Sequence, residues 1–292
     1  MIDDELFKTE CRGGLDCAVG VREAQETYNK VQPYFKSATG TASLYQGDAL
    51  QLLAQCKSDF VDLIFADPPY FLSGGGLTCH GGRAVSVNKG AWDRPRTIAE
   101  VHEFNLSWLT ECQRILKPNG TIFVTGTSHN IFSVGFAIQS LGFKLLNDIA
   151  WFKVNPPPNL SCRYFTHATE TIIWAAKSTT AKHVFNYDAM RNMPDPAVGK
   201  QMLSLWRIPP PSTWEKRHGK HPTQKPEELL NRIILAASNP GDIVLDPFMG
   251  GGTTAVSAIA HQRRFIGFEL EVDYLDIATR RITDITNDQE IR

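Results

Sequence analysis

The fold is decided by the stretch Leu245-Asp246-Pro247-Phe248-Met249-Gly250-Gly251-Gly252-Thr253. The apolar run that ends at Asp246 predicts a strand, and a helix is predicted over Thr253–Ala260. The three glycines between them permit a tight turn and let the backbone approach a ligand closely. The stretch therefore predicts a strand, a glycine loop and a helix, the unit that binds nucleotide-like ligands in α/β proteins.

A second stretch, Asp67-Pro68-Pro69-Tyr70, follows the continuous apolar run Asp62–Ala66. Such runs are typical of parallel strands that are buried on both faces. Open α/β sheets bind their ligands at the carboxyl edge of the strands, and we expect Asp67 to lie at that edge.

Strands and helices alternate through most of the remaining chain. Strands are predicted over or near 43–46, 121–125, 148–152, 171–176 and 264–268, and helices over 98–116, 129–141, 226–238 and 272–282. This alternation predicts an α/β fold whose sheet is largely parallel and covered by helices on both faces. Residues 73–92 contain six glycines and no period, so we predict a mobile loop there.

We divide the chain into four parts. Residues 1–38 form an N-terminal extension without a clear period, and 39–176 carry the Asp-Pro-Pro-Tyr motif. Residues 177–220 break the alternation with prolines and basic side chains, so we predict an irregular basic insert. Residues 221–292 carry the glycine loop.

Composition narrows the class of protein. The chain has 292 residues, 42% hydrophobic and 21% charged, which is ordinary for a globular protein. It has no apolar run of membrane-spanning length, and its acidic start does not resemble a signal peptide. The six cysteines form no Cys-x-x-Cys pair, so we expect reduced thiols in a cytoplasmic protein. The net charge of −1 means that any nucleic-acid site must be a local basic surface.

Glu269 ends the strand after the glycine loop, 23 residues beyond Asp246. A carboxylate there can accept hydrogen bonds from both hydroxyls of a ribose, as in a dinucleotide or in S-adenosylmethionine. The loop lacks the Gly-x-Gly-x-x-Gly spacing of pyrophosphate sites, and its Asp-Pro-Phe suits the cationic methionine end of S-adenosylmethionine. The pattern favours that cofactor, and the alternative is a turn that only needs glycine.

The chemistry of Asp67-Pro68-Pro69-Tyr70 suits an amine on a flat ring. The lone pair of such an amine is delocalised into the ring, so the amine is a poor nucleophile. Asp67 and the carbonyl of Pro68 can each accept one N–H, which localises the lone pair and stabilises the positive charge that develops during attack. The ring of Tyr70 can stack on a base, worth roughly 1–3 kcal/mol. The alternative is a proline-rich strand end with a packed tyrosine.

In this order, the two motifs resemble the β-group of amino-methylating DNA methyltransferases, over roughly residues 43–283. The resemblance implies a Rossmann-like, S-adenosylmethionine-dependent methyltransferase fold with a circularly permuted motif order, in which the catalytic motif precedes the target-recognition region and the cofactor loop comes last. Gly251 departs from the serine or alanine that is usual in the family. The resemblance also implies cofactor-binding roles for Asp48, Ala49, Asp67, His221, Thr223, Lys225, Asp246, Pro247, Phe248, Gly250, Gly252, Thr253 and Glu269.

Four further stretches resemble the second, single-strand-tolerant adenine methyltransferases of Dpn-type GATC restriction systems. These stretches are residues 67–73, 85–90, 92–93 and 159–167. They imply adenine methylation in GATC, in double-stranded and also single-stranded DNA, within a restriction–modification system. HindIII-type enzymes share some of these stretches, which leaves AAGCTT as an alternative target.

Contacts with DNA are expected from exposed basic and aromatic residues, and 73–92 is predicted to form a lid that orders over the DNA. The candidates are Lys89, Trp92, Arg163, Tyr164, His167, Arg191, Lys216 and Arg217. Each has the alternative of a solvated or packed surface position. We predict no metal site, because His221 has no nearby set of cysteine or carboxylate ligands. A monomer and a homodimer both remain open.

Other functions fit the two motifs less well. RNA and protein methyltransferases usually carry the glycine loop before the Asn/Asp-Pro-Pro-Tyr motif, and a silent DNA-binding module would not need Asp67, Tyr70 and Glu269 intact. Cytosine-amine methylation remains an alternative, although that subgroup usually has serine at the position of Asp67. The absence of a Pro-Cys pair argues against methylation of cytosine carbon 5.

Overall fold

The computed structural model describes residues 6–7, 31–71, 77–80, 83–86, 96–156, 158–159, 161–193 and 201–290, with only the backbone considered at 77–80, 83–86 and 288–290. Lys89, Trp92 and most of the predicted lid lie outside the described residues. Among the described residues, no helix combines the length and apolar character needed to cross a membrane.

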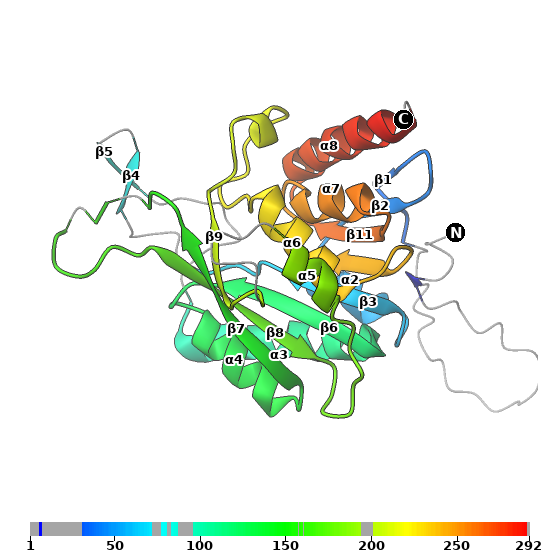
Figure 1. Ribbon diagram of the computed structural model, residues 1–292, viewed down its shortest axis with the longest axis horizontal. Helices are drawn as coiled ribbons and strands as arrows, with labels where there is room; N and C mark the ends of the chain where they lie inside the picture. The colour runs from blue at the N-terminus through cyan, green and yellow to red at the C-terminus, as the bar shows by residue number, and fades with distance from the viewer. Residues whose placement is uncertain are drawn as a thin grey trace, which may run out of the picture.

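Nine strands of the described chain form one sheet in the order β1-β2-β11-β10-β3-β6-β8-β7-β9 (Figure 1). The strands from β2 to β6 in this order are parallel, β7 and β9 are also parallel, and β1 and β8 run antiparallel to their neighbours. Their bounds are Phe35–Lys36 (β1), Ala42–Gln46 (β2), Val61–Ala66 (β3), Leu116–Gly126 (β6), Lys144–Lys153 (β7), Thr169–Ala176 (β8), Leu205–Ile208 (β9), Ile243–Asp246 (β10) and Arg264–Glu269 (β11). The prediction of a largely parallel sheet is confirmed.

Helices cover both faces of this sheet, as predicted (Figure 1). One core contains side chains of α2 (Ala49–Gln55), α3 (Ile98–Ile115) and α4 (Ile131–Ser140), and the other contains side chains of α6 (Glu227–Ala237), α7 (Thr253–Ala260) and α8 (Val272–Glu290). Strand β3 serves both cores, because Ile64 packs into the first and Leu63 and Phe65 pack into the second. Burial on both faces explains why its sequence is apolar without alternation.

The chain changes direction across the sheet between β10 and β3. From β10 it continues through α7 to β11 on one side, whereas from β3 it continues through α3 to β6 on the other. Val244 and Leu245 of β10 pair with Leu63 and Ile64 of β3, so the carboxyl ends of the two strands are neighbours. Open α/β sheets bind ligands at such a switch point, and both sequence motifs begin there.

Several connections leave the sheet at this carboxyl edge. Strand β7 is antiparallel to β8, which is antiparallel to β6, so β7 ends at the same edge as β3. Strand β9 is parallel to β7 and ends there too. The chain therefore leaves β7 and β9 beside the two motifs, whereas it leaves β8 at the opposite edge of the sheet. Figure 1 shows the β7–β8 connection and the β4–β5 hairpin extending to the same side.

Three segments differ from the predictions. Residues predicted as a loop contain the antiparallel hairpin of β4 (Leu77–His80) and β5 (Arg83–Ser86). The insert predicted to be irregular contains α5 (Tyr187–Asn192) and β9, which belongs to the main sheet. The prediction failed at β9 because only Trp206 and Ile208 are buried in a four-residue strand that prolines follow. Strand β6 begins at Leu116 and includes the Lys-Pro-Asn-Gly that was predicted to separate helix from strand.

Candidate active site

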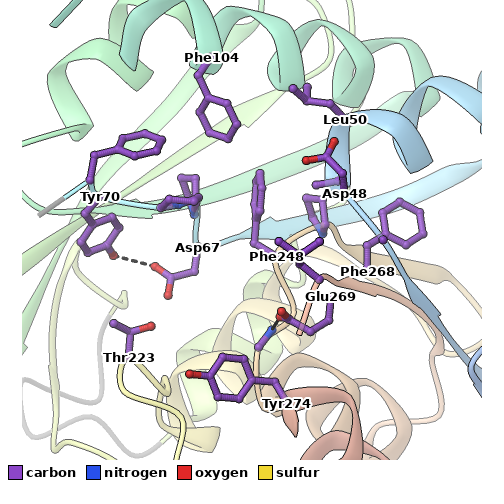
Figure 2. Close-up of a pocket in the computed structure, with 18 of the residues that line it drawn as sticks. Asp48, Leu50, Asp67, Tyr70, Phe104, Thr223, Phe248, Phe268, Glu269 and Tyr274 are labelled. Atoms are coloured by element: carbon purple, nitrogen blue, oxygen red, sulfur yellow. Dashed lines mark hydrogen bonds between the residues drawn. The ribbon is translucent and has the colours of Figure 1, made fainter. Parts of the chain in front are cut away.

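A cavity of about 250 Å³ lies at the carboxyl edge, around the switch point of the sheet (Figure 2). The structure brings most of the predicted cofactor and catalytic residues into its wall. These are Asp48, Ala49, Asp67, Pro68, Pro69, Tyr70, His221, Thr223, Pro247, Phe248, Gly250 and Glu269. Four predicted cofactor residues, namely Lys225, Asp246, Gly252 and Thr253, do not line it.

Asp246 lies beneath the glycine loop and shapes it. Its Oδ1 accepts a hydrogen bond from the backbone N–H of Phe248 at 3.0 Å, and its Oδ2 accepts one from the Thr254 hydroxyl at 2.5 Å. Burial raises the pKa of Asp246 to about 7, against the lowering effect of these two hydrogen bonds. The carboxyl group thus joins the end of β10 to the start of α7, and it does not line the cavity.

Two glycines of the loop are required by its backbone. Gly250 and Gly252 have φ angles of +53° and +76°, which side chains disfavour. A Cβ at Gly252 would lie 2.7 Å from the Cβ of Ala278 in α8, and one at Gly250 would lie 3.0 Å from the His221 ring. Gly251 has neither restriction, which explains how the family can carry serine or alanine there. Gly252 thus shapes the loop rather than lining the cavity.

Glu269 closes the loop against the end of β11. Its Oε2 accepts a hydrogen bond from Gly250 N–H at 2.8 Å, and its Oε1 accepts one from Glu271 N–H at 2.9 Å. Burial raises the pKa of this carboxyl group, although the backbone donors oppose the rise. Each oxygen retains a second lone pair, so the carboxylate can still accept from the two hydroxyls of a ribose.

The cavity fits a nucleoside that is joined to a cationic amino acid. Three carboxylates line it, from Asp48, Asp67 and Glu269, and they suit hydroxyl donors and positive charge. Its apolar wall provides ring faces for an adenine. That wall includes Leu50, Phe104, Phe248, Phe268 and Tyr274. Of these, only Phe248 was predicted from the sequence. His221 packs edge-on against Tyr274 at 4.3 Å, and no group of metal-ligating residues occurs among the described residues.

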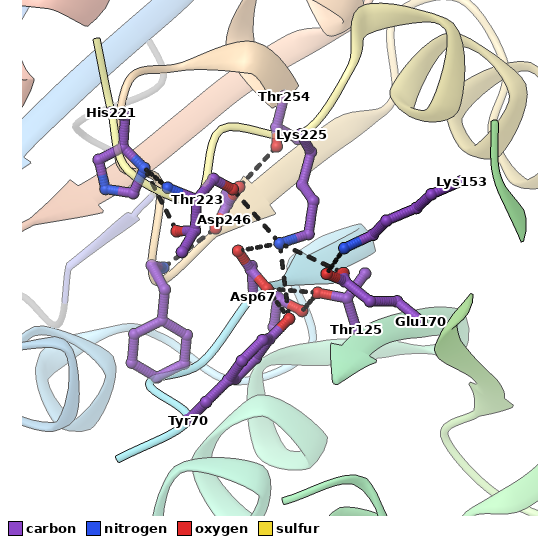
Figure 3. Close-up of polar contacts among 12 residues, drawn as sticks. Asp67, Tyr70, Thr125, Lys153, Glu170, His221, Thr223, Lys225, Asp246 and Thr254 are labelled. Carbon is purple, nitrogen blue, oxygen red and sulfur yellow. Dashed lines mark hydrogen bonds and ion pairs between the residues drawn. The ribbon is translucent and has the colours of Figure 1, made fainter. Parts of the chain in front are cut away.

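Asp67 accepts hydrogen bonds at both carboxylate oxygens (Figure 3). Its Oδ1 accepts from the hydroxyls of Tyr70 at 2.7 Å and Thr125 at 2.6 Å, and its Oδ2 accepts from Lys225 Nζ at 2.5 Å. Burial opposes ionisation, but the charge of Lys225 and the three donors outweigh it, so the pKa of Asp67 is below its usual value. Asp67 is therefore a carboxylate at neutral pH.

The loop after Asp67 is held in an unusual conformation. Phe71 has a φ of +55°, which a side chain adopts only when its surroundings impose it. Its ring packs edge-on against Phe104 at 5.4 Å and lies under the Arg96 guanidinium at 4.4 Å. The Tyr70 side chain lines the cavity and is almost buried, and burial raises the pKa of its hydroxyl well above the usual value.

Lys225 differs from its expected place. Family resemblance gave it a cofactor-binding role, but its side chain is buried outside the cavity wall. Besides Asp67, its Nζ faces Glu170 Oε2 at 3.7 Å, and Lys153 binds Glu170 Oε1. The sequence analysis missed Thr125 and Glu170; the former lies near the end of the strand beside β3 and could have been found from that position.

The described DNA candidates lie at three places in the fold. Arg163, Tyr164 and His167 are exposed in the β7–β8 connection at the carboxyl edge, with the rings of the last two 5.5 Å apart. Arg191 is exposed in α5, in the segment that follows the opposite end of β8, so the structure does not bring it to this edge.

Two other candidates lie after β9 and already have partners. Lys216 donates to the Pro211 carbonyl at 2.8 Å. Arg217 donates to Asp284 at 2.9 Å, and its guanidinium covers the Trp214 ring at 4.1 Å. Both side chains are therefore anchored to the protein, and neither lines the cavity.

Comparison with known proteins identifies the class. The family described as DNA methylase matches residues 61–280. The chain is 51% identical over 252 residues to the type II methyltransferase M2.DpnII of Streptococcus pneumoniae, covering 86% of this chain and 92% of that protein. It is 46% identical over 257 residues to M2.MboI of Moraxella bovis, covering 88% and 93%. The chain therefore belongs to the DNA methylase family, as the sequence predicted.

Solved structures agree with this assignment. One of them is the structure of M1.HpyAVI in complex with S-adenosylmethionine (SAM), which has a TM-score of 0.60 and a sequence 28% identical to this chain. The match covers 82% of this chain and 98% of that one. The PvuII cytosine-N4-specific DNA methyltransferase has a TM-score of 0.64 at 23% identity, with 88% and 94% covered, and shows the shared fold. The protein is thus a DNA methyltransferase whose methyl donor is S-adenosylmethionine.

Proposed function

We propose that this protein methylates the exocyclic amine of adenine within GATC, as the modification enzyme of a type II restriction–modification system in the cytoplasm. The observation that carries the adenine assignment is the ionised Asp67 in the cavity wall, followed by Pro68. The type II relatives M2.DpnII and M2.MboI support the GATC assignment, because they match most of the chain and carry the names of the GATC-type systems that the sequence motifs resemble.

Asp67 and Pro68 would act on the amine together. A carboxylate and a carbonyl that is freed by proline each accept one N–H, which favours a pyramidal nitrogen with a localised lone pair. S-adenosylmethionine supplies an electrophilic methyl group when it is bound. We assign its ribose to Glu269, and its adenine to the apolar wall near Leu50, Phe248 and Phe268.

The DNA would approach the carboxyl edge and present its target base outside the helical stack. Exposed residues of the β7–β8 connection, Arg163, Tyr164 and His167, suit contacts with phosphates and unstacked bases. We exclude Arg191 from this surface, because its segment lies toward the other edge. We include single-stranded DNA as a substrate, because an unpaired base avoids an unpairing cost of a few kcal/mol. The homodimer stays a prediction that sedimentation of the free protein would test.

A matched set of oligonucleotides tests the proposal. Each carries GATC or AAGCTT, in single- or double-stranded form, and methylated nucleosides are identified after digestion at two salt concentrations. We expect N6-methyladenine in GATC on both forms, with duplex activity falling steeply as salt rises. Methylation of AAGCTT alone would move the target to the HindIII type, N4-methylcytosine would refute the role given to Asp67, and no product would refute the whole proposal.

A further inference from the structure

Four charged side chains form an alternating chain beneath the cavity (Figure 3). Lys153 at the end of β7 pairs with Glu170 at the start of β8, Glu170 faces Lys225, and Lys225 pairs with Asp67. The side chains of Lys225, Glu170 and Asp67 are only 6%, 9% and 12% exposed. Buried charges persist only when they are paired, so these contacts fix where each group can go.

Glu170 has one carboxylate oxygen that can accept a further hydrogen bond. Lys153 binds its Oε1, whereas its Oε2 is buried and accepts no hydrogen bond from the described residues. The Nζ of Lys225 faces that oxygen at 3.7 Å, just beyond hydrogen-bond distance. A small movement of a flexible lysine would therefore satisfy an acceptor whose desolvation is otherwise uncompensated.

In the proposed reaction, Asp67 has to stabilise a second positive charge besides that of Lys225. The target amine becomes positively charged as it is methylated, and Asp67 is the group that would stabilise that charge. In the free protein, however, Asp67 Oδ2 already neutralises the ammonium of Lys225 at 2.5 Å, while Tyr70 and Thr125 occupy Oδ1. Two cations at one buried carboxylate repel each other strongly, because screening by water is weak there.

We propose that Lys225 is a positioning residue that moves its hydrogen bond from Asp67 Oδ2 to Glu170 Oε2 when the target amine enters the cavity. This inference rests on the proposed function. Before the base arrives, Lys225 keeps Asp67 ionised and fixed. Afterwards Glu170 holds the ammonium, with Lys153 fixing its other oxygen, and Asp67 Oδ2 faces the amine without a competing cation.

The movement of Lys225 can be tested by single-turnover methylation of GATC oligonucleotides. The proteins compared are the wild type, Glu170→Gln, Lys225→Gln and the double variant. Glu170→Gln should slow methylation on the order of tenfold, with unchanged affinity for S-adenosylhomocysteine, because Lys225 then has no second carboxylate. In the Lys225→Gln background the same change should cost less than about twofold, since no ammonium remains to be received. Equal losses in both backgrounds would overturn the inference.

The pH profile separates positioning from structural damage. Lys225→Gln should shift the acidic limb of the rate to higher pH, because burial then acts on Asp67 without an opposing cation; Lys225→Arg, which keeps the charge, should not. A loss that is equal at every pH indicates a structural role and overturns the inference.

A third measurement follows the lysine directly. The NMR signal of the Lys225 side chain should change when the S-adenosylhomocysteine complex binds a GATC oligonucleotide, and not when purine, which lacks the amine, replaces the target adenine. If the signal is unchanged when adenine is bound, Lys225 does not move from Asp67 to Glu170, but the proposed function still stands. No methylation of adenine by the wild type overturns the function itself.

Discussion

Replacing Asp67 with asparagine should separate its electrostatic role from its shape. Asparagine can keep its oxygen toward Tyr70 and Thr125, but its NH₂ group would then face Lys225 Nζ, which also only donates. The variant loses a charge-assisted hydrogen bond worth about 1.5–3 kcal/mol. Removing one partner of a buried pair costs roughly 3–5 kcal/mol, and Glu170 can relieve part of that cost by accepting Lys225. We therefore expect a variant about 2–3 kcal/mol less stable at neutral pH.

The same structure predicts how this stability loss depends on pH. The pKa of Asp67 is lowered in the folded protein, so its contribution to stability is present above the pKa of the unfolded chain and is lost as pH falls through the folded value. The difference in unfolding free energy between wild type and Asp67→Asn should therefore be full near pH 7 and should shrink below about pH 4. Urea titrations at several pH values measure it.

Activity should fall as well as stability. Loss of a preorganised charged acceptor costs on the order of 10²–10³ in rate, or more. The assay is single-turnover transfer from labelled S-adenosylmethionine at saturating concentration, with calorimetric titration of S-adenosylhomocysteine to show that cofactor affinity is largely kept. Thr125→Val is the control, because it removes one neutral donor and keeps the charge. A folded Asp67→Asn protein that methylates DNA at nearly the wild-type rate would refute the reasoning.

Four further variants test the cofactor loop and the residues that hold it. Glu269→Ala should lower affinity for S-adenosylhomocysteine by roughly 1–3 kcal/mol and affect the rate at saturating cofactor less, and unchanged affinity by calorimetry rules out the ribose assignment. Gly252→Ala should lower the unfolding free energy by about 1–3 kcal/mol, because its φ is +76° and its Cβ would meet Ala278, whereas Gly251→Ala should be nearly neutral; equal effects in urea titrations contradict this account of the loop. The pKa of Asp246 is raised to about 7, so its favourable contribution in the cofactor-free protein is present below about pH 4 and lost as pH rises through 7. Asp246→Asn should therefore become more stable relative to wild type between pH 4 and pH 8, and a constant difference over that range would show that the pKa is not raised.

Much of the fold follows from local sequence. The doubly buried strand β3 and the strand β10 are continuous apolar runs, and α7 begins where the glycines end, so these elements were predictable within about one residue. The loops after them carry Asp67 and Gly250, and parallel strands place both at one edge. Strand β9 was not predictable, because tertiary contacts of Trp206 and Ile208 form it rather than any local pattern.

The partners of the catalytic carboxylate were beyond sequence reasoning for a different reason. Lys225 is 158 residues from Asp67, and Thr125 is 58 residues away. Their meeting depends on the order of strands in the sheet and on the path of the chain after β9, neither of which a motif specifies. Family resemblance found Lys225 as a residue near the site, and only the structure shows that it contacts Asp67 rather than the cavity.

The two motifs show that aspartates of the same Asp-Pro dipeptide can have pKa values that are shifted in opposite directions. Both begin with Asp-Pro at the ends of the neighbouring strands β3 and β10, and both aspartates are buried or nearly so. Lys225 holds Asp67 ionised, whereas burial raises the pKa of Asp246 to about 7, because the donors that reach it from the described residues are neutral and oppose this rise only in part. Proteins assign different roles to two titratable groups by placing them in environments that separate their pKa values. At neutral pH Asp67, which lines the cavity, is therefore fully charged, whereas Asp246, which shapes the loop, is only partly charged.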